Sequence, residues 1–136
     1  MVEESPTLVG RLGSLELKPS QLAPYDRPIG LKQLYQAAAT GEEHHLVRYP
    51  AGMRARWHRH TAAHTIVVLE GSLMANGQLL EGGAYCHFPG GQPMHHEPGP
   101  GGGCLFVILF HGPFDVEVIA DRGDAERAAP EGVPSG

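Results

Sequence analysis

Glycine and proline interrupt this chain at short intervals, with 19 glycines and 12 prolines among 136 residues. Both residues destabilise helix interiors, glycine by about 1 kcal/mol and proline by about 3 kcal/mol relative to alanine. Long helices are therefore not expected. Between the interruptions lie short apolar runs, of which TIVVLEG over 65–71 is rich in the β-branched residues that favour strands. Short strands separated by turn signals at roughly 8- to 12-residue intervals favour an all-β sandwich or barrel.

One hairpin can be placed directly, because Asn76 and Gly77 stand between two apolar segments. A two-residue type I′ turn needs positive φ at both central positions, and Asn-Gly is the pair that adopts it most readily. We therefore predict that 72–75 and 78–81 pair as antiparallel strands. Further strands are expected over 28–36, 44–50, 65–71, 85–88, 104–112 and 113–120.

The length fits a single domain, since domains typically run from about 100 to 200 residues. Apolar residues make up 41% of the chain, which is enough to bury one core. We expect the barrel over 28–120, an N-terminal tail or edge strand over 1–27, and a flexible C-terminal tail over 121–136. Cys86 and Cys104 lie in apolar runs without a CxxC spacing, so buried free thiols are expected.

Charge and hydropathy exclude several classes of partner. The formal net charge is −5 and no run of lysine or arginine occurs, which argues against nucleic acid, because phosphate binding needs a concentrated basic face. No stretch of about 18 consecutive apolar residues is present, and the first residues lack the basic and apolar regions of a secretion signal. We therefore expect a soluble, cytoplasmic protein that binds neither nucleic acid nor membranes.

Histidine is the most informative residue type for function, since seven of the nine histidines fall between residues 58 and 111. His58 and His60 are two apart, so on a strand both side chains point to the same face, where two imidazoles can bind one ion. His64 follows after a gap long enough for a bend and begins the next strand. Three nitrogen ligands can thus come from seven consecutive residues.

A fourth ligand can come from the segment PGGQPMHH over 89–96. Alternation along a strand lets only one of His95 and His96 face inward, and we expect His95, with His96 as the alternative. Imidazole suits zinc, copper, iron and nickel, so a four-histidine site does not identify its metal.

These spacings resemble the two motifs of the cupin family. The first reads Gly52, five residues, His58-Arg59-His60, three residues, His64, six residues and Gly71, with His64 where cupins usually have glutamate. The second reads Gly83, five residues and Pro89-Gly90-Gly91, with Met94 at the expected histidine position and His95 and His96 directly after it. The resemblance covers about residues 28 to 119. It implies a cupin double-stranded β-helix, also called a jelly-roll barrel, that holds one divalent metal ion, Fe(II) or Zn(II).

The histidine at position 64 makes the site resemble the three- and four-histidine centres of acetylacetone-cleaving and thiol dioxygenases. This resemblance implies a non-haem Fe(II) dioxygenase, or a metal-dependent isomerase or cyclase, that acts on a small chelating anion such as a β-diketone. The segment LVRYPAGMRARWHRH also resembles the zinc-binding cupin domain of anti-sigma factors. A zinc-binding sensor or small-molecule binding module without catalysis is therefore the alternative.

The surroundings of the site are less clearly marked by the sequence. His87, His111, Tyr85 and Met94 are candidates to line a substrate pocket. No catalytic base is indicated, because no motif places either of the nearby carboxylates, Glu70 and Glu97. A homodimer is expected, since a small barrel leaves apolar strands and unpaired edges exposed.

Overall fold

The computed structural model describes residues 7–119, which form ten strands and one short 3-10 helix, Leu12–Ser14. The strands are β1 (Lys18–Ser20), β2 (Ile29–Gln36), β3 (Glu43–Tyr49), β4 (His58–Arg59), β5 (His64–Ala75), β6 (Gln78–Glu81), β7 (Tyr85–Phe88), β8 (His96–Pro98), β9 (Cys104–Phe110) and β10 (Glu117–Val118). The expected all-β class is confirmed.

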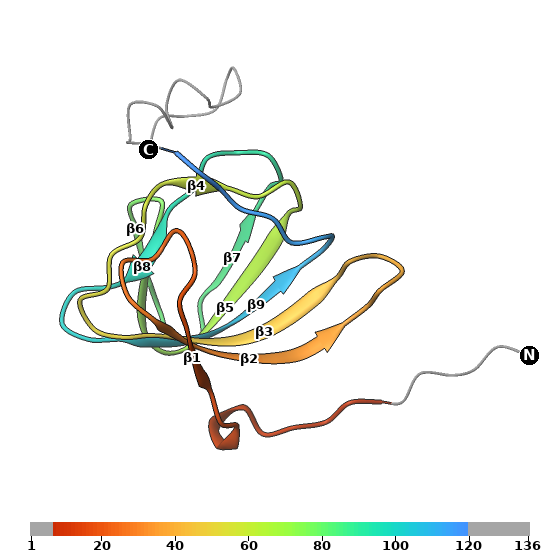
Figure 1. Ribbon diagram of the computed structural model, residues 1–136. Coiled ribbons are helices and arrows are strands. Elements are labelled where there is room, and N and C mark those ends of the chain that lie inside the picture. The colour runs from red at the N-terminus through yellow and green to blue at the C-terminus, as the bar shows by residue number, and fades with distance from the viewer. Residues whose placement is uncertain (1–6, 120–136) are drawn as a thin grey trace, which may run out of the picture.

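Most strands belong to one antiparallel sheet with the order β1-β2-β3-β9-β5-β6. Strand β5 is the longest, and its two halves have different partners: 64–67 pair with β7, whereas 73–75 pair with β8. A register shift between Val68 and Glu70 bends β5 between these halves. The sheet therefore curls into the barrel seen in Figure 1.

The predicted Asn76-Gly77 hairpin is confirmed. Ser72 to Ala75 pair with Gln78 to Glu81, and the φ angles are 47° at Asn76 and 82° at Gly77, as a type I′ turn requires. Gly71 also has a positive φ of 73°, and a Cβ there would collide with the carbonyl oxygen of Gly103. The motif glycine at 71 is thus needed where β5 passes the start of β9.

The segment over 113–120 is less regular than expected. Within its described residues, 113–119, the segment forms one strand, β10 (Glu117–Val118), which pairs with β4 and not with the main sheet. Residue 120 and the predicted tail over 121–136 lie outside the described residues. At the other end, β1 pairs with β2 at the edge of the sheet, and residues 1–6 are likewise not described. Among residues 7–119, no helix has the length and apolarity needed to cross a bilayer.

The core fills the inside of the curled sheet. Every second residue of the central strands points inward, as strand geometry dictates. Ile66 and Val68 of β5 meet Phe106 and Ile108 of β9 there, all at most 5% exposed. Cys104 is buried and Cys86 is half-buried, and both are free thiols.

Candidate functional site

Four buried histidines gather inside the barrel. They are His58, His60, His64 and His96, and each is at most 6% exposed. They come from β4, the loop after it, the start of β5 and the start of β8. Their ring centroids lie 4.9 Å apart for His58–His60, 5.0 Å for His60–His64, 5.4 Å for His58–His96 and 6.0 Å for His64–His96. The structure therefore brings together three histidines of the first motif and one that follows the second.

Backbone carbonyls fix the tautomers of His58 and His60. The Nδ1 of His58 lies 2.9 Å from the carbonyl oxygen of Arg56, and the Nδ1 of His60 lies 2.5 Å from that of Asp115. A carbonyl can only accept a hydrogen bond, so each Nδ1 carries the proton and each Nε2 keeps a lone pair. Metal-binding histidines are commonly held in this way, with the non-ligating nitrogen donating to a neighbouring oxygen.

Several imidazole nitrogens of the cluster are buried without a hydrogen-bond partner among the described residues. They are Nε2 of His58, Nε2 of His96 and both ring nitrogens of His64. A buried polar atom without a partner costs about 1 to 3 kcal/mol, so such atoms are rare unless something else binds them. The unpartnered nitrogens fit a metal ion, which would take up their lone pairs.

Burial keeps the four imidazoles neutral. It lowers the pKa of His58 to about 4 and that of His64 to about 3, and positive neighbouring imidazoles would lower both further. The pKa values of His60 and His96 are also lowered, again mainly by burial. Neutral imidazole is the form that binds metals, so the whole cluster is ready to ligate at neutral pH.

Over residues 7–119, no three His, Cys, Asp or Glu side chains already lie at the spacing of a metal-ligand set. The four rings nevertheless meet edge to face. Among the described residues, the Nε2 atoms of His58, His64 and His96 have no hydrogen-bond partner, and the tautomer of His60 leaves the lone pair of its Nε2 free. Imidazole nitrogens suit zinc, copper, iron and nickel, so the donor chemistry of the cluster fits a divalent ion.

The structure places His96 in the cluster and His95 outside it. From the sequence we expected His95 to face inward, with His96 as the alternative. The Nε2 of His95 lies 2.8 Å from the carbonyl oxygen of Ala55, and its ring stacks on Trp57 with centroids 5.4 Å apart. The reason is register: His96 pairs with Ala75 of β5, so consecutive side chains 95 and 96 point to opposite faces. The insertion after the second motif is thus two residues long.

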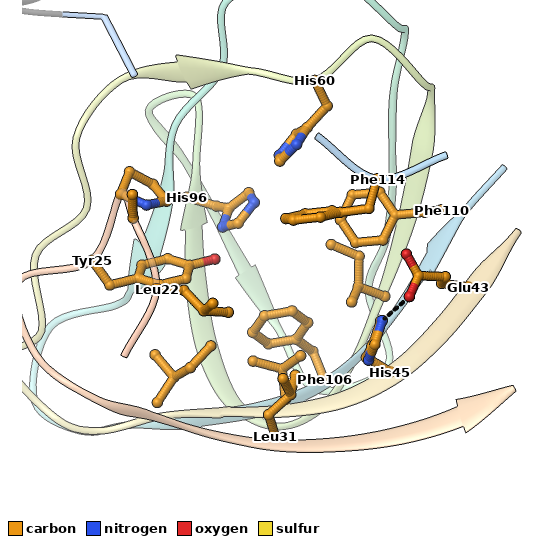
Figure 2. A pocket seen from close by; sticks show the side chains of 15 residues that line it. Leu22, Tyr25, Leu31, Glu43, His45, His60, His96, Phe106, Phe110 and Phe114 are labelled. Carbon is orange, nitrogen blue, oxygen red and sulfur yellow. Dashed lines mark ion pairs between the residues drawn. The ribbon is translucent and has the colours of Figure 1, made fainter. Parts of the chain in front are cut away.

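A cavity of about 200 Å³ lies beside the cluster (Figure 2). His60, His96 and Tyr25 line one side of it, and Glu43 and His45 line the other. The remaining wall is apolar and includes Leu22, Val47, Phe106, Phe110 and Phe114. An apolar cavity of about 150 Å³ can hold a benzene molecule, so this one fits a ligand the size of a single ring.

Two tyrosine hydroxyls form a hydrogen-bonded chain with Nδ1 of His96. The hydroxyls of Tyr25 and Tyr49 lie 2.5 Å apart, and the Tyr49 hydroxyl lies 2.6 Å from Nδ1 of His96. Burial raises the pKa of both phenols, so both remain protonated at neutral pH. Sequence reasoning missed Tyr25 because it lies in the segment expected to be a tail or edge strand, with no motif around it.

Sequence reasoning also missed Glu43 and His45, because polar residues at the start of a strand, as in β3, are usually exposed to solvent. Glu43 Oε1 lies 3.6 Å from Nε2 of His45, with side chains 17% and 13% exposed. Alternation could have indicated them, since 43, 45, 47 and 49 share one face and Val47 and Tyr49 are core residues. Burial lowers the pKa of His45, and the Glu43 carboxylate partly opposes that shift.

Within the described residues, none of the four candidates for the substrate pocket lines the cavity beside the cluster, although His111 lines a separate surface hollow. His87 and His111 are exposed and lie 3.0 and 2.8 Å from the Thr65 hydroxyl, on the face of β5 opposite His64. Tyr85 is 66% exposed, and Met94 is a core residue bridged to His58 through the backbone. Because side chains alternate along β7, Tyr85 and His87 are exposed whereas Phe88 is buried.

The two nearby carboxylates are engaged elsewhere. Glu70 lies 3.8 Å from Arg48 at the surface. Glu97 accepts a hydrogen bond from the backbone of Ala55 and lies 3.6 Å from Arg54. Neither is among the residues that line the cavity in the described part of the chain.

The curled antiparallel sheet with this arrangement of motifs is the barrel of the cupin superfamily. The sequence profile of the ChrR cupin-like domain matches residues 17–115, and the chain therefore belongs to that family. No curated protein matches the sequence significantly.

Solved structures with the same fold include two enzymes. An acetylacetone dioxygenase from Acinetobacter johnsonii is 17% identical, with a TM-score of 0.73 and 94% of each chain covered. The polyketide cyclase RemF from Streptomyces resistomycificus is 18% identical, with a TM-score of 0.64 over 88% of this chain and 86% of that one. A cupin-like protein from Thermotoga maritima is 18% identical, with a TM-score of 0.68 over 88% and 97%. At these identities the likeness establishes the fold alone.

Proposed function

We propose that this chain is a metal-dependent cupin enzyme of the non-haem Fe(II) dioxygenase type, acting on a small chelating anion such as a β-diketone enolate. The observation that carries the proposal is the cluster of four neutral histidines with unpartnered nitrogens beside a one-ring cavity. The fold shared with an acetylacetone dioxygenase adds support.

His58, His60, His64 and His96 would hold the ion, each through a neutral imidazole nitrogen. A divalent ion in that position would polarise and orient a chelating substrate and provide a site for O₂. Because no carboxylate belongs to the cluster, none of the four ligands would neutralise the ion's positive charge, which favours an anionic substrate. The apolar wall around Phe106 and Phe110 keeps water away from the bound substrate and strengthens that attraction.

Metal-assisted isomerisation or cyclisation uses the same residues, and the fold shared with a polyketide cyclase favours it as a variant of this proposal. A second candidate function is a zinc-binding module without catalysis, favoured by membership of the ChrR cupin-like family. Four histidines can supply all four ligands of a tetrahedral zinc ion, and an anion then binds only where the ion accepts a fifth ligand.

Elemental analysis of protein purified without added metal, followed by oxygen uptake after Fe(II) is restored, tests the proposal. The enzyme should bind about one Fe(II) per chain, develop a charge-transfer band with acetylacetone under anaerobic conditions, and consume oxygen on mixing. His58→Ala should abolish all three, whereas His87→Ala, which removes an exposed histidine outside the cluster, should change none. Stoichiometric zinc, no band and no oxygen uptake would instead favour the binding module; oxygen-independent turnover of a polyketide-like substrate would favour the isomerase or cyclase.

The cytoplasmic location and the homodimer remain predictions. Leu79, at 48% exposure on β6, and Leu8 and Val9 near the start of the described chain expose apolar surface that a second copy could cover. Light scattering at micromolar concentration should give the mass of a dimer, and a monomer would contradict the prediction.

A further inference from the structure

A chain of three hydrogen-bonding groups runs from His96 through Tyr49 to Tyr25, and both His96 and Tyr25 line the cavity. The Nδ1 of His96 lies 2.6 Å from the Tyr49 hydroxyl, and that hydroxyl lies 2.5 Å from the Tyr25 hydroxyl. Tyr49 and His96 are fully buried, and Tyr25 lines the cavity. The direction in which these groups donate is not fixed by their distances, because each hydroxyl can donate or accept.

Ligation of a metal would fix that direction. If Nε2 of His96 gives its lone pair to an ion, the single proton of the neutral imidazole must reside on Nδ1. Nδ1 then donates to the Tyr49 oxygen, so the Tyr49 proton is available for Tyr25. Among the described residues, the Tyr25 hydroxyl is the other hydrogen-bond partner of the Tyr49 side chain, and it therefore accepts.

The proton of Tyr25 is then left without a protein acceptor. Tyr49 is the hydroxyl's hydrogen-bond partner in the described chain, and it is already donating. Figure 2 shows the Tyr25 hydroxyl directed toward the interior of the pocket, between His96 and Phe106. A free O–H at an apolar wall is an unsatisfied donor, which favours a ligand oxygen at that point.

We propose that Tyr25 is the hydrogen-bond donor that holds an anionic oxygen of the ligand, and that metal ligation by His96 frees it for this task. This inference rests on the proposed function, because it requires an ion on His96. The ligand class follows from the cavity: a molecule the size of one ring, with a carboxylate or enolate group placed between the ion and Tyr25, and an apolar body against Phe106 and Phe110.

The same chain gives the opposite result when Nε2 of His96 carries the proton. Nδ1 is then an acceptor, Tyr49 donates to it, and Tyr25 donates to Tyr49. Tyr25 has no proton left for a ligand in that state. The chain therefore couples metal binding to anion binding through two phenols, in addition to the direct attraction between ion and anion.

Zinc-loaded protein and benzoate test this without any turnover. Calorimetry should show that Tyr25→Phe binds zinc within about threefold of the unsubstituted protein. Its benzoate affinity should fall about tenfold or more, because hydrogen bonds to charged groups are among the strong ones. Tyr85→Phe removes the same atom from an exposed site outside the cavity and should leave both affinities unchanged.

Tyr49→Phe should give the reverse pattern. His96 loses the partner that orients it, so zinc affinity should fall about 10- to 100-fold, the usual effect of removing such a partner. At saturating zinc, benzoate should still bind within about threefold of the unsubstituted protein, since Tyr25 keeps a free proton. A structural role alone would lower both affinities together in both variants, and that result would overturn the inference.

The two failures are distinguishable. No zinc binding by the unsubstituted protein overturns the proposed function and this inference with it, whereas zinc binding with unchanged benzoate affinity in Tyr25→Phe overturns the inference alone.

If Tyr25→Phe does not fold, ¹³Cζ-tyrosine labelling of the unsubstituted protein replaces it. The Tyr25 signal should shift when benzoate is added to the zinc-loaded protein and stay unchanged when benzoate is added without zinc; any other result contradicts the inference.

Discussion

The His64 imidazole stacks on the Phe88 ring, with centroids 4.8 Å apart and planes 16° apart, and neither His64 nitrogen has a hydrogen-bond partner within the described chain. His64 thus occupies a site suited to an apolar side chain. Phe110 also contacts it, at a centroid distance of 5.1 Å. A residue so placed is costly to the fold unless its nitrogens bind something.

His64→Leu should therefore stabilise the protein when metal has been removed by a chelator. The substitution removes two unsatisfied buried polar atoms, each of which costs about 1 to 3 kcal/mol, and keeps an apolar side chain against Phe88. Urea unfolding in the presence of chelator should give a free energy of unfolding higher by about 1 kcal/mol or more. Added metal should stabilise the variant less than the unsubstituted protein. A less stable variant in chelator would show that His64 has a structural partner.

His64→Glu should separate metal binding from anion binding. Glutamate restores the residue usual in cupins and adds one negative charge beside the ion, so Fe(II) should still bind. The affinity for an anion such as acetylacetonate should fall, because the glutamate already neutralises part of the ion's charge. Anaerobic titration of the charge-transfer band measures this affinity.

His64→Ala is the matched comparison for His64→Glu, and it should bind iron more weakly. Full iron content with the same spectrum would mean that His64 is not a ligand.

Metal-stripped protein should lose stability in acid well before its carboxylates are protonated. The ordinary pKa of histidine is about 6.5, whereas burial lowers those of His58 and His64 to about 4 and about 3. As pH falls below about 6.5, the unfolded chain gains protons that the folded chain does not. The free energy of unfolding should then fall with decreasing pH by up to about 1.4 kcal/mol per pH unit for each such histidine, until the folded pKa is reached.

Urea unfolding in chelator at pH values between 7 and 4 checks this dependence. His64→Leu provides the control, since it removes one of the titrating groups and should give a shallower slope. The same slope in both proteins would mean that His64 takes up its proton over the same pH range in the folded and unfolded states, which contradicts its burial.

Local sequence signals were sufficient for the hairpin and for the first three histidines. The Asn76-Gly77 turn depends on the φ preferences of two adjacent residues, and His58 and His60 share a face because strand geometry has a period of two. His64 joins them because it begins the next strand only four residues later. In each case the determining interactions lie within a few residues along the chain.

The choice between His95 and His96 could not be made in that way. It depends on the register of β8 against β5, where Ala75 faces His96, and this register is set by the length of the loop after Gly91. The position of Tyr25 beside the cavity depends on a contact between segments that are still farther apart along the chain. Its segment is held by backbone bonds to the 54–56 loop, including Asp26 to Arg54 and Arg56 to Pro24, and no periodicity in residues 1–27 indicates that contact.

Glu43→Gln should lower the pKa of His45. Burial already depresses it, and the Glu43 carboxylate opposes that depression by attracting the protonated ring from 3.6 Å. The amide of glutamine carries no charge, so the attraction is lost while the size of the side chain is kept. An NMR titration of the His45 ring protons in metal-free protein should show the midpoint moving to lower pH.

Glu42→Gln is the matched control, because Glu42 pairs with His44 and not with His45. The Glu42–His44 pair lies at 3.1 Å, and both side chains are about one third exposed. An unchanged His45 midpoint in Glu43→Gln would show that the pair on the cavity wall does not interact in solution.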